Sequence, residues 1–285
     1  MYSFFKHLGL HRIDHPVGLV LFVLLSGTAG VMAVLFVVEE SVRWDEMNLF
    51  LFIGTTALFT AVLIYAYYTK SLRNTLFLFV LSCLISLIAE YAGTHSNLPF
   101  GHRCVYHPNI QPMLFGHIPM VIPLAWFMIG FTPLVFLKRY HVYKERPHHM
   151  YKRIVKVSLC ALYMVGLDLF IDPLAISVTA WTWETNGVYF GVPATNFVGW
   201  FFVGFIIHAV YTLFEKGNRK APEKSSYVFE GSFMLISMTM TGMGWVTFVF
   251  RLGFHPVMLL PLLILVPFWV YGLMSITGFN EPKKS

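Results

Sequence analysis

Long apolar runs, separated by shorter polar segments, dominate the pattern of residues along this chain. An α-helix needs about 20 apolar residues to cross the hydrocarbon core of a bilayer. Eight runs come close to that length, at residues 17–38, 49–68, 75–92, 118–137, 154–172, 195–214, 229–250 and 256–277. The pattern predicts an all-α, polytopic membrane helix bundle of about eight transmembrane helices. Residues 1–285 are expected to form a single integral membrane domain.

The positions of the basic residues predict how this bundle is oriented. The chain contains 20 Lys and Arg residues. With the N-terminus in the cytoplasm, only Arg43, Arg103 and Arg251 fall on outer segments. Cytoplasmic loops of membrane proteins carry an excess of Lys and Arg. This bias predicts that both termini are cytoplasmic and that the chain is a multi-pass protein of the cytoplasmic (inner) membrane.

The overall composition supports a membrane protein and excludes a water-soluble fold. Hydrophobic residues make up 57% of the chain and charged residues 12%, whereas soluble domains carry about 25% charged residues. The formal net charge of +6 reflects topology rather than a nucleic-acid-binding surface. The three cysteines do not indicate a disulfide framework, because two of them lie inside apolar runs.

Two outer connections, residues 93–117 and 173–194, are unusually long and rich in Gly, Pro and aromatic residues. Long irregular loops in compact membrane proteins tend to carry function or to fold back into the protein. We therefore expect the functional site near these loops.

Three acidic residues, Glu90, Asp168 and Asp172, lie at the outer ends of predicted helices. A charged residue inside a span costs about 2.5–3.5 kcal/mol and usually faces the protein interior. Asp168 and Asp172 are four residues apart, so they share one helix face. Two carboxyl groups in one apolar site cannot both ionise cheaply. The pattern predicts a catalytic acid pair, one member of which keeps its proton near neutral pH.

A structural role for these acids is the competing interpretation. In that case Asp172 and Pro173 would simply end a helix, and Asp168 would be hydrogen-bonded to a Trp or Tyr. A fourth acid, Glu230, is expected at a helix start, where a carboxylate suits the helix dipole. We interpret Glu230 as a cap.

Histidines in the first long loop raise the question of a metal site. His95, His102, His107 and His117 follow one another at spacings of 7, 5 and 10 residues. None of these spacings matches a known ligand pattern such as His-Glu-x-x-His. We therefore predict no metal ligands, and assign His102, His117 and Glu184 an auxiliary role beside the acids.

Aromatic residues surround the acids in the sequence, and we expect them to contact the substrate. They are Tyr91, Phe100, Tyr106, Trp126, Trp181, Trp183, Tyr189 and Trp200. Aromatic faces stabilise cations, by about 2 kcal/mol or more when water is excluded. A buried acid ringed by aromatic side chains suggests protonation of a carbon–carbon double bond, followed by stabilisation of the carbocation.

Several sequence blocks resemble those of a known family. They read AEYAGTHSNLPFG, GHIPMVIPLAWFM, DLFIDP and WTWETNGVYFGVPATNFVGW, and together span roughly residues 87–201. They are similar to the membrane carotenoid biosynthesis family that contains the bisanhydrobacterioruberin hydratases and gamma-carotene 1',2'-hydratases. The last block adds Asn196 to the expected substrate-binding residues.

The resemblance implies a carotenoid hydratase, a hydro-lyase that adds water to the terminal C1–C2 double bond of an acyclic psi end. It implies no cofactor. The expected partners are a carotenoid or other isoprenoid lipid as substrate, membrane lipids, and other enzymes of the carotenoid pathway, with no nucleic acid.

Three alternatives stay open at this stage. A carotenoid cyclase would begin with the same protonation but let an internal double bond capture the cation. A proton-coupled lipid transporter or lipid-binding protein would use the acids as a relay. A metal-dependent oxygenase or hydrolase would need the histidines.

Overall fold

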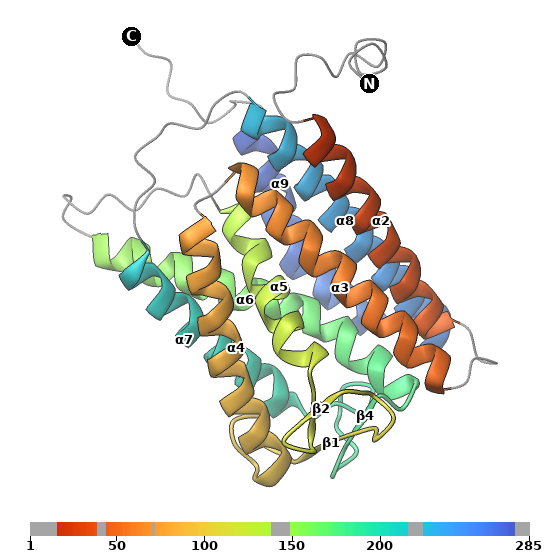
Figure 1. Cartoon of the computed structure of the whole chain (residues 1–285). Coiled ribbons are helices and arrows are strands. Elements are labelled where there is room, and N and C mark those ends of the chain that lie inside the picture. Colours follow the sequence, from red (N-terminus) through yellow and green to blue (C-terminus); the bar gives the residue numbers. More distant parts are fainter. Residues whose placement is uncertain (1–15, 39–43, 70–71, 138–148, 216–224, 277–285) are drawn as a thin grey trace.

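The computed structural model describes residues 16–38, 44–69, 72–137, 149–215 and 225–276 (Figure 1). These residues form an all-α, polytopic helical membrane protein with eight α-helices. The helices are α2 (Pro16–Val38), α3 (Trp44–Thr69), α4 (Leu72–His95), α5 (Val121–Phe136), α6 (His149–Ser177), α7 (Ala194–Phe214), α8 (Ser225–Leu252) and α9 (Leu260–Ile276). A 3₁₀-helix, η2 (Pro256–Leu259), leads into α9.

The sequence-based prediction of eight apolar helices is confirmed, because each predicted run overlaps one helix of the bundle. Six helices in the described residues are long and apolar enough to cross a membrane, and two apolar segments, Gly18–Val31 and Val121–Phe136, are shorter. The start of α2 and the end of α9 lie at the same end of the bundle (Figure 1). The terminal residues 1–15 and 277–285, and most of the basic residues behind the predicted orientation, lie outside the described residues.

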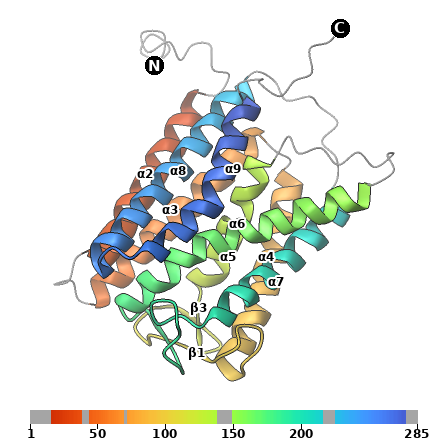
Figure 2. The same cartoon turned by 180° about the vertical axis from the view of Figure 1, so that it is seen from behind.

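Helix α6 is the central element of the bundle. It packs against α5, α7, α8 and α9, and it runs obliquely across the bundle (Figure 2). In the most apolar segment of α6, 61% of the residues are buried, whereas the corresponding share is 28–39% in the other five candidate spans. The two aspartates on this helix, Asp168 and Asp172, are buried within the protein.

Short β-strands join the two long outer loops at one end of the bundle. Strand β1 (Cys104–Tyr106) lies between α4 and α5, and strand β4 (Trp181–Trp183) lies between α6 and α7. They pair antiparallel, with Cys104 opposite Trp183 and Tyr106 opposite Trp181. A second pair joins β2 (Met113–Leu114) to β3 (Ile118–Pro119). The strand pairing holds together the ends of helices that are distant in sequence.

Two sequence-based expectations about local structure are wrong. Pro173 lies inside α6, because the buried residues Leu174 and Ala175 beyond it hold the last turn helical despite the lost N–H donor. Glu230 does not cap a helix. Helix α8 begins earlier, at Ser225, so Glu230 lies in its second turn and is only 2% exposed.

Candidate active site

Three buried carboxyl groups converge on one small cavity. Glu90 comes from α4, and Asp168 and Asp172 come from α6. Their exposed fractions are 5%, 1% and 2%, respectively. All three line a cavity of about 60 Å³ near the paired strands β1 and β4. The fold thus brings together acids that are more than 70 residues apart in the chain.

Both oxygens of Glu90 accept hydrogen bonds from aromatic side chains. The Tyr106 hydroxyl donates to Oε2 at 2.7 Å, and the Trp126 indole N–H donates to Oε1 at 2.8 Å. An indole N–H can only donate. Glu90 is therefore bound as an acceptor by residues of β1 and α5.

Asp168 and Asp172 share one hydrogen-bond donor. Nδ2 of Asn196, on α7, lies 2.9 Å from Asp168 Oδ2 and 2.7 Å from Asp172 Oδ2. A primary amide carries two N–H groups, so one nitrogen can serve both carboxyl groups. The Trp181 indole donates to Asp172 Oδ1. Among the described residues, Asp168 Oδ1 accepts no hydrogen bond.

Positive charge does not balance these acids. In the described part of the chain, no Lys or Arg forms an ion pair with any of the three. The ion pair nearest in sequence joins Arg103 to Glu184 at 3.2 Å, and both side chains are 46% exposed. An ionised carboxylate is costly to bury without a partner. The site therefore favours a state in which at least one carboxyl group keeps its proton.

Aromatic rings form most of the remaining wall. Trp126 stacks on Trp200 with ring centroids 3.9 Å apart. Tyr106 meets Trp181 edge-on at 5.7 Å, and Phe100 meets Trp183 edge-on at 6.4 Å. These six residues line the carboxyl cavity. Ring faces around buried acids provide an environment in which a cation is stabilised.

Two glycines allow Phe100 to reach this wall. A Cβ atom on Gly93 of α4 would lie 2.7 Å from the Phe100 ring, and a Cβ atom on Gly199 of α7 would lie 2.7 Å from the same ring. Real Cβ atoms do not approach so closely. Glycine at both positions lets Phe100 insert between the two helices.

Two further groups in the loops stay protonated at neutral pH. Burial raises the pKa of the Tyr106 hydroxyl well above its ordinary value, and the adjacent Glu90 charge adds to this. Burial also raises the pKa of the Cys104 thiol, with smaller contributions from Glu90, Asp172 and Asp168. Tyr106 is therefore a stable donor to Glu90. Cys104 is a neutral lining group rather than a reactive thiolate.

Most of the residues singled out from the sequence line the carboxyl cavity. They are Glu90, Phe100, Tyr106, Trp126, Asp168, Asp172, Trp181, Trp183, Asn196 and Trp200. Tyr189 is buried beside them, 8% exposed, but is not part of the lining. Sequence reasoning missed Cys104 and four apolar residues, Ile122, Ala125, Ile129 and Ile171.

Four of the expected residues lie elsewhere. Tyr91 is 46% exposed and stacks on His95 at 4.2 Å. His117 meets the edge of His95 at 4.9 Å. His102 is outside the lining, and Glu184 pairs with Arg103 at the surface. Within the described residues, no three His, Cys, Asp or Glu side chains are placed to hold a metal ion together.

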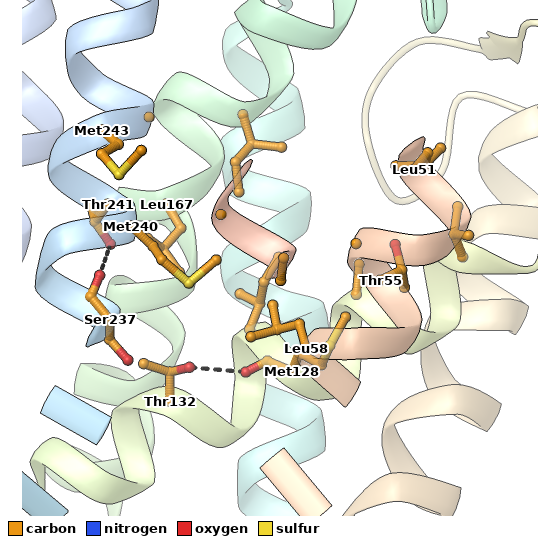
Figure 3. Close-up of a pocket in the computed structure, with 18 of the residues that line it drawn as sticks. Leu51, Thr55, Leu58, Met128, Thr132, Leu167, Ser237, Met240, Thr241 and Met243 are labelled. Atoms are coloured by element: carbon orange, nitrogen blue, oxygen red, sulfur yellow. Dashed lines mark hydrogen bonds between the residues drawn. The ribbon is translucent and has the colours of Figure 1, made fainter. Parts of the chain in front are cut away.

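A larger apolar cavity adjoins the carboxyl cavity. It has a volume of about 400 Å³ and lies between α2, α3, α5, α6 and α8. Figure 3 shows Leu58, Met128, Leu167 and Met240 among its wall residues. Five residues line both cavities: Ile122, Ala125, Ile129, Ile171 and Trp181. The two spaces are therefore neighbours that share part of their wall.

Hydroxyl groups in the larger cavity are partly satisfied by their own helices. Thr132 Oγ1 donates to the Met128 carbonyl at 2.9 Å, and Thr241 Oγ1 donates to the Ser237 carbonyl at 2.7 Å (Figure 3). These bonds leave a largely apolar wall. The arrangement suits an apolar ligand.

Comparison with known proteins gives one match. Residues 46–267, well over half of the chain, match the model of a family described as "Carotenoid biosynthesis protein". The matched range contains both long loops and every residue of the carboxyl cavity. No curated protein and no solved structure matches the chain.

Proposed function

Since this chain belongs to the carotenoid biosynthesis protein family, we propose that it is a carotenoid hydratase acting on an isoprenoid substrate in the membrane. It adds water to the terminal C1–C2 double bond of an acyclic carotenoid psi end. The product is a tertiary alcohol.

The adjacency of the two cavities is the observation that carries this proposal. An apolar space of about 400 Å³ shares five wall residues with a site that has three buried carboxyl groups. A polyene in the larger space would present its end group to the acids. The acids lie at the ends of α4 and α6, where the chain end of a membrane-embedded polyene would also lie.

Asp168 is the proposed proton donor. Both oxygens of Asp172 accept from N–H groups, those of the Trp181 indole and of the Asn196 side-chain NH2. A proton on Asp172 would weaken these bonds. Asp168 has one oxygen, Oδ1, without a donor among the described residues, so it can carry the proton. Glu90, held by two donors, acts as a fixed negative charge.

The reaction then runs in two steps. Asp168 transfers its proton to C2, which breaks the C1–C2 π bond and leaves a tertiary carbocation at C1. The rings of Trp126, Trp200 and their neighbours, together with the carboxylates, stabilise this cation. A water oxygen bonds to C1 and releases a proton to the aspartate pair. The aspartate pair loses one proton and regains one, so it is regenerated in each cycle. Addition of water to a double bond is redox-neutral overall, so no redox cofactor is needed.

Expression in a lycopene-producing host tests the proposal. Hydration increases the mass of the pigment by one water for each reacting end. Pigments of unchanged mass that carry a ring would instead identify a cyclase, which shares the protonation step. Unmodified lycopene, in cells with verified membrane insertion of the protein, would contradict both reactions.

A further inference from the structure

Two buried donors next to the aspartates make no hydrogen bond. The indole nitrogen of Trp183 and the hydroxyl oxygen of Tyr189 are buried and lack a partner among the described residues. An unsatisfied buried donor costs about 1–3 kcal/mol and is uncommon in folded proteins. Both residues belong to the loop between α6 and α7.

Each of these donors lies beside one of the aspartates. Trp183 lines the carboxyl cavity, with its nitrogen close to the Asp172 carboxyl group but outside hydrogen-bonding geometry. Tyr189 is 8% exposed and lies near Asp168. Burial, with a contribution from the Asp168 charge, raises the pKa of the Tyr189 hydroxyl above its ordinary value. The phenol therefore keeps its proton.

The other donors at this site are already engaged. Trp126 and Tyr106 donate to Glu90. Trp181 donates to Asp172, and both N–H groups of Asn196 are used by the aspartates. Among the N–H donors that line the cavity, that of Trp183 is left for a group that enters it, whereas Tyr189 lies outside the lining.

The cavity has room for such a group. A bound water needs about 10–15 Å³ and two to four polar partners. The carboxyl cavity measures about 60 Å³. The Trp183 N–H and the Asp172 carboxylate would each supply a partner at one position.

We propose that Trp183 binds the oxygen that becomes the hydroxyl group of the product. This inference rests on the proposed hydratase function. The Trp183 N–H holds a water beside the aspartate pair. That water forms the new C1–O bond, and its proton passes to the carboxylate of the pair.

Weakening this site changes the fate of the cation rather than its formation. A cation that is not captured loses a proton again and regenerates an alkene. In deuterated water the donated proton is a deuteron, so the regenerated carotenoid carries deuterium without added oxygen. The ratio of deuterated, unhydrated carotenoid to hydrated product measures the capture step separately from protonation.

The test uses the full-length protein in lipid vesicles with lycopene in deuterated water. Trp183→Phe keeps an aromatic ring but removes the donor. We expect this variant to raise the ratio about three- to tenfold, which corresponds to the free energy of one hydrogen bond. Tyr189→Phe removes a buried donor outside the lining and should leave the ratio unchanged. Trp181→Phe is the matched control. It removes a donor to Asp172, so it should lower both products together and leave the ratio unchanged.

The outcomes separate this inference from the proposed function. If the wild type hydrates lycopene but Trp183→Phe does not alter the ratio, the oxygen site is wrong and the hydratase proposal stands. A ratio raised equally by Trp181→Phe or Tyr189→Phe would also contradict the site, because the effect would not be specific to the Trp183 donor. If the wild type gives neither hydrated nor deuterated carotenoid, the proposed function fails, and this inference fails with it.

Discussion

Trp126 donates its indole N–H to Oε1 of Glu90 at 2.8 Å, and this bond connects α5 to α4 inside the carboxyl cavity. Trp126 also stacks on Trp200 of α7 at 3.9 Å. The glutamate is therefore positioned by two neighbouring helices rather than by its own helix alone. Its charge has a fixed place relative to the aspartates on α6, and this relationship leads to the predictions below.

Asp168→Asn should abolish hydration while leaving the fold intact. The amide oxygen of the new side chain can still accept from Asn196, so the packing is preserved. Loss of a general acid typically lowers a rate by 10²–10⁴-fold, and we expect a loss at the upper end of that range. Hydrated product and folded yield should be measured together.

Asp172→Asn is the matched variant for the donor assignment. It retains Asp168 as proton donor, so its loss of rate should be smaller. Equal losses in the two variants would contradict the assignment of distinct roles. Full activity in both, with normal folding, would contradict acid catalysis by this pair.

Tyr106→Phe should weaken the site by removing one hydrogen bond to Glu90. A hydrogen bond to a charged group is worth about 1.5–3 kcal/mol, so we expect the rate to fall by about tenfold to a hundredfold. The measurement is the initial hydration rate in vesicles. Tyr91→Phe is the control, since Tyr91 is 46% exposed and outside the cavity. A Tyr91 effect as large as that of Tyr106 would contradict the described geometry.

Ala125→Phe should block the junction between the two cavities. Ala125 lines both of them, so a large ring there would keep the end of a polyene away from the acids. We expect at least a tenfold fall in kcat/KM, with the thermal stability changed far less than the activity. Leu84→Phe, at a position that is 56% exposed on α4, provides a control for added bulk. Undiminished activity of Ala125→Phe would show that substrate does not pass this point.

Gly199→Ala should destabilise the protein through Phe100. The added Cβ would lie 2.7 Å from that ring, and overpacking typically costs about 1–3 kcal/mol. A lower melting temperature in detergent is expected, together with reduced activity. Gly242→Ala is the control, because nothing lies within 4 Å of a Cβ at that position. Ala is the better helix former, so the control should be neutral or stabilising. Equal melting temperatures would contradict the close packing of Phe100.

The helices and the acid pair could be predicted because their signals are local. Membrane-length apolar runs gave the eight helices. The four-residue spacing of Asp168 and Asp172 predicted one shared helix face, and this is confirmed by their common donor, Asn196. Cys104 could have been found from the alternation in β1, because it lies two residues from Tyr106 and is buried with it.

The parts that depend on long-range contacts could not be predicted. The pairing of β1 with β4 joins loops about 80 residues apart, and nothing in either loop alone specifies its partner. This pairing separates the loop residues that reach the acids from those that do not. His102, His117 and Glu184 are polar and belong to the same two loops as the cavity residues, yet they lie outside the cavity. Ile122, Ala125 and Ile129 share one face of α5, but an apolar face alone does not indicate a cavity.

Incubation of the purified protein with lycopene in water labelled with heavy oxygen tests the central claim most directly. The account predicts a product whose added hydroxyl carries the label, with one labelled oxygen for each hydrated end. It also predicts that Asp168→Asn forms none of this product under the same conditions. Wild-type protein that is folded, binds lycopene and yields either no labelled product or a cyclised product of unchanged mass would contradict the account.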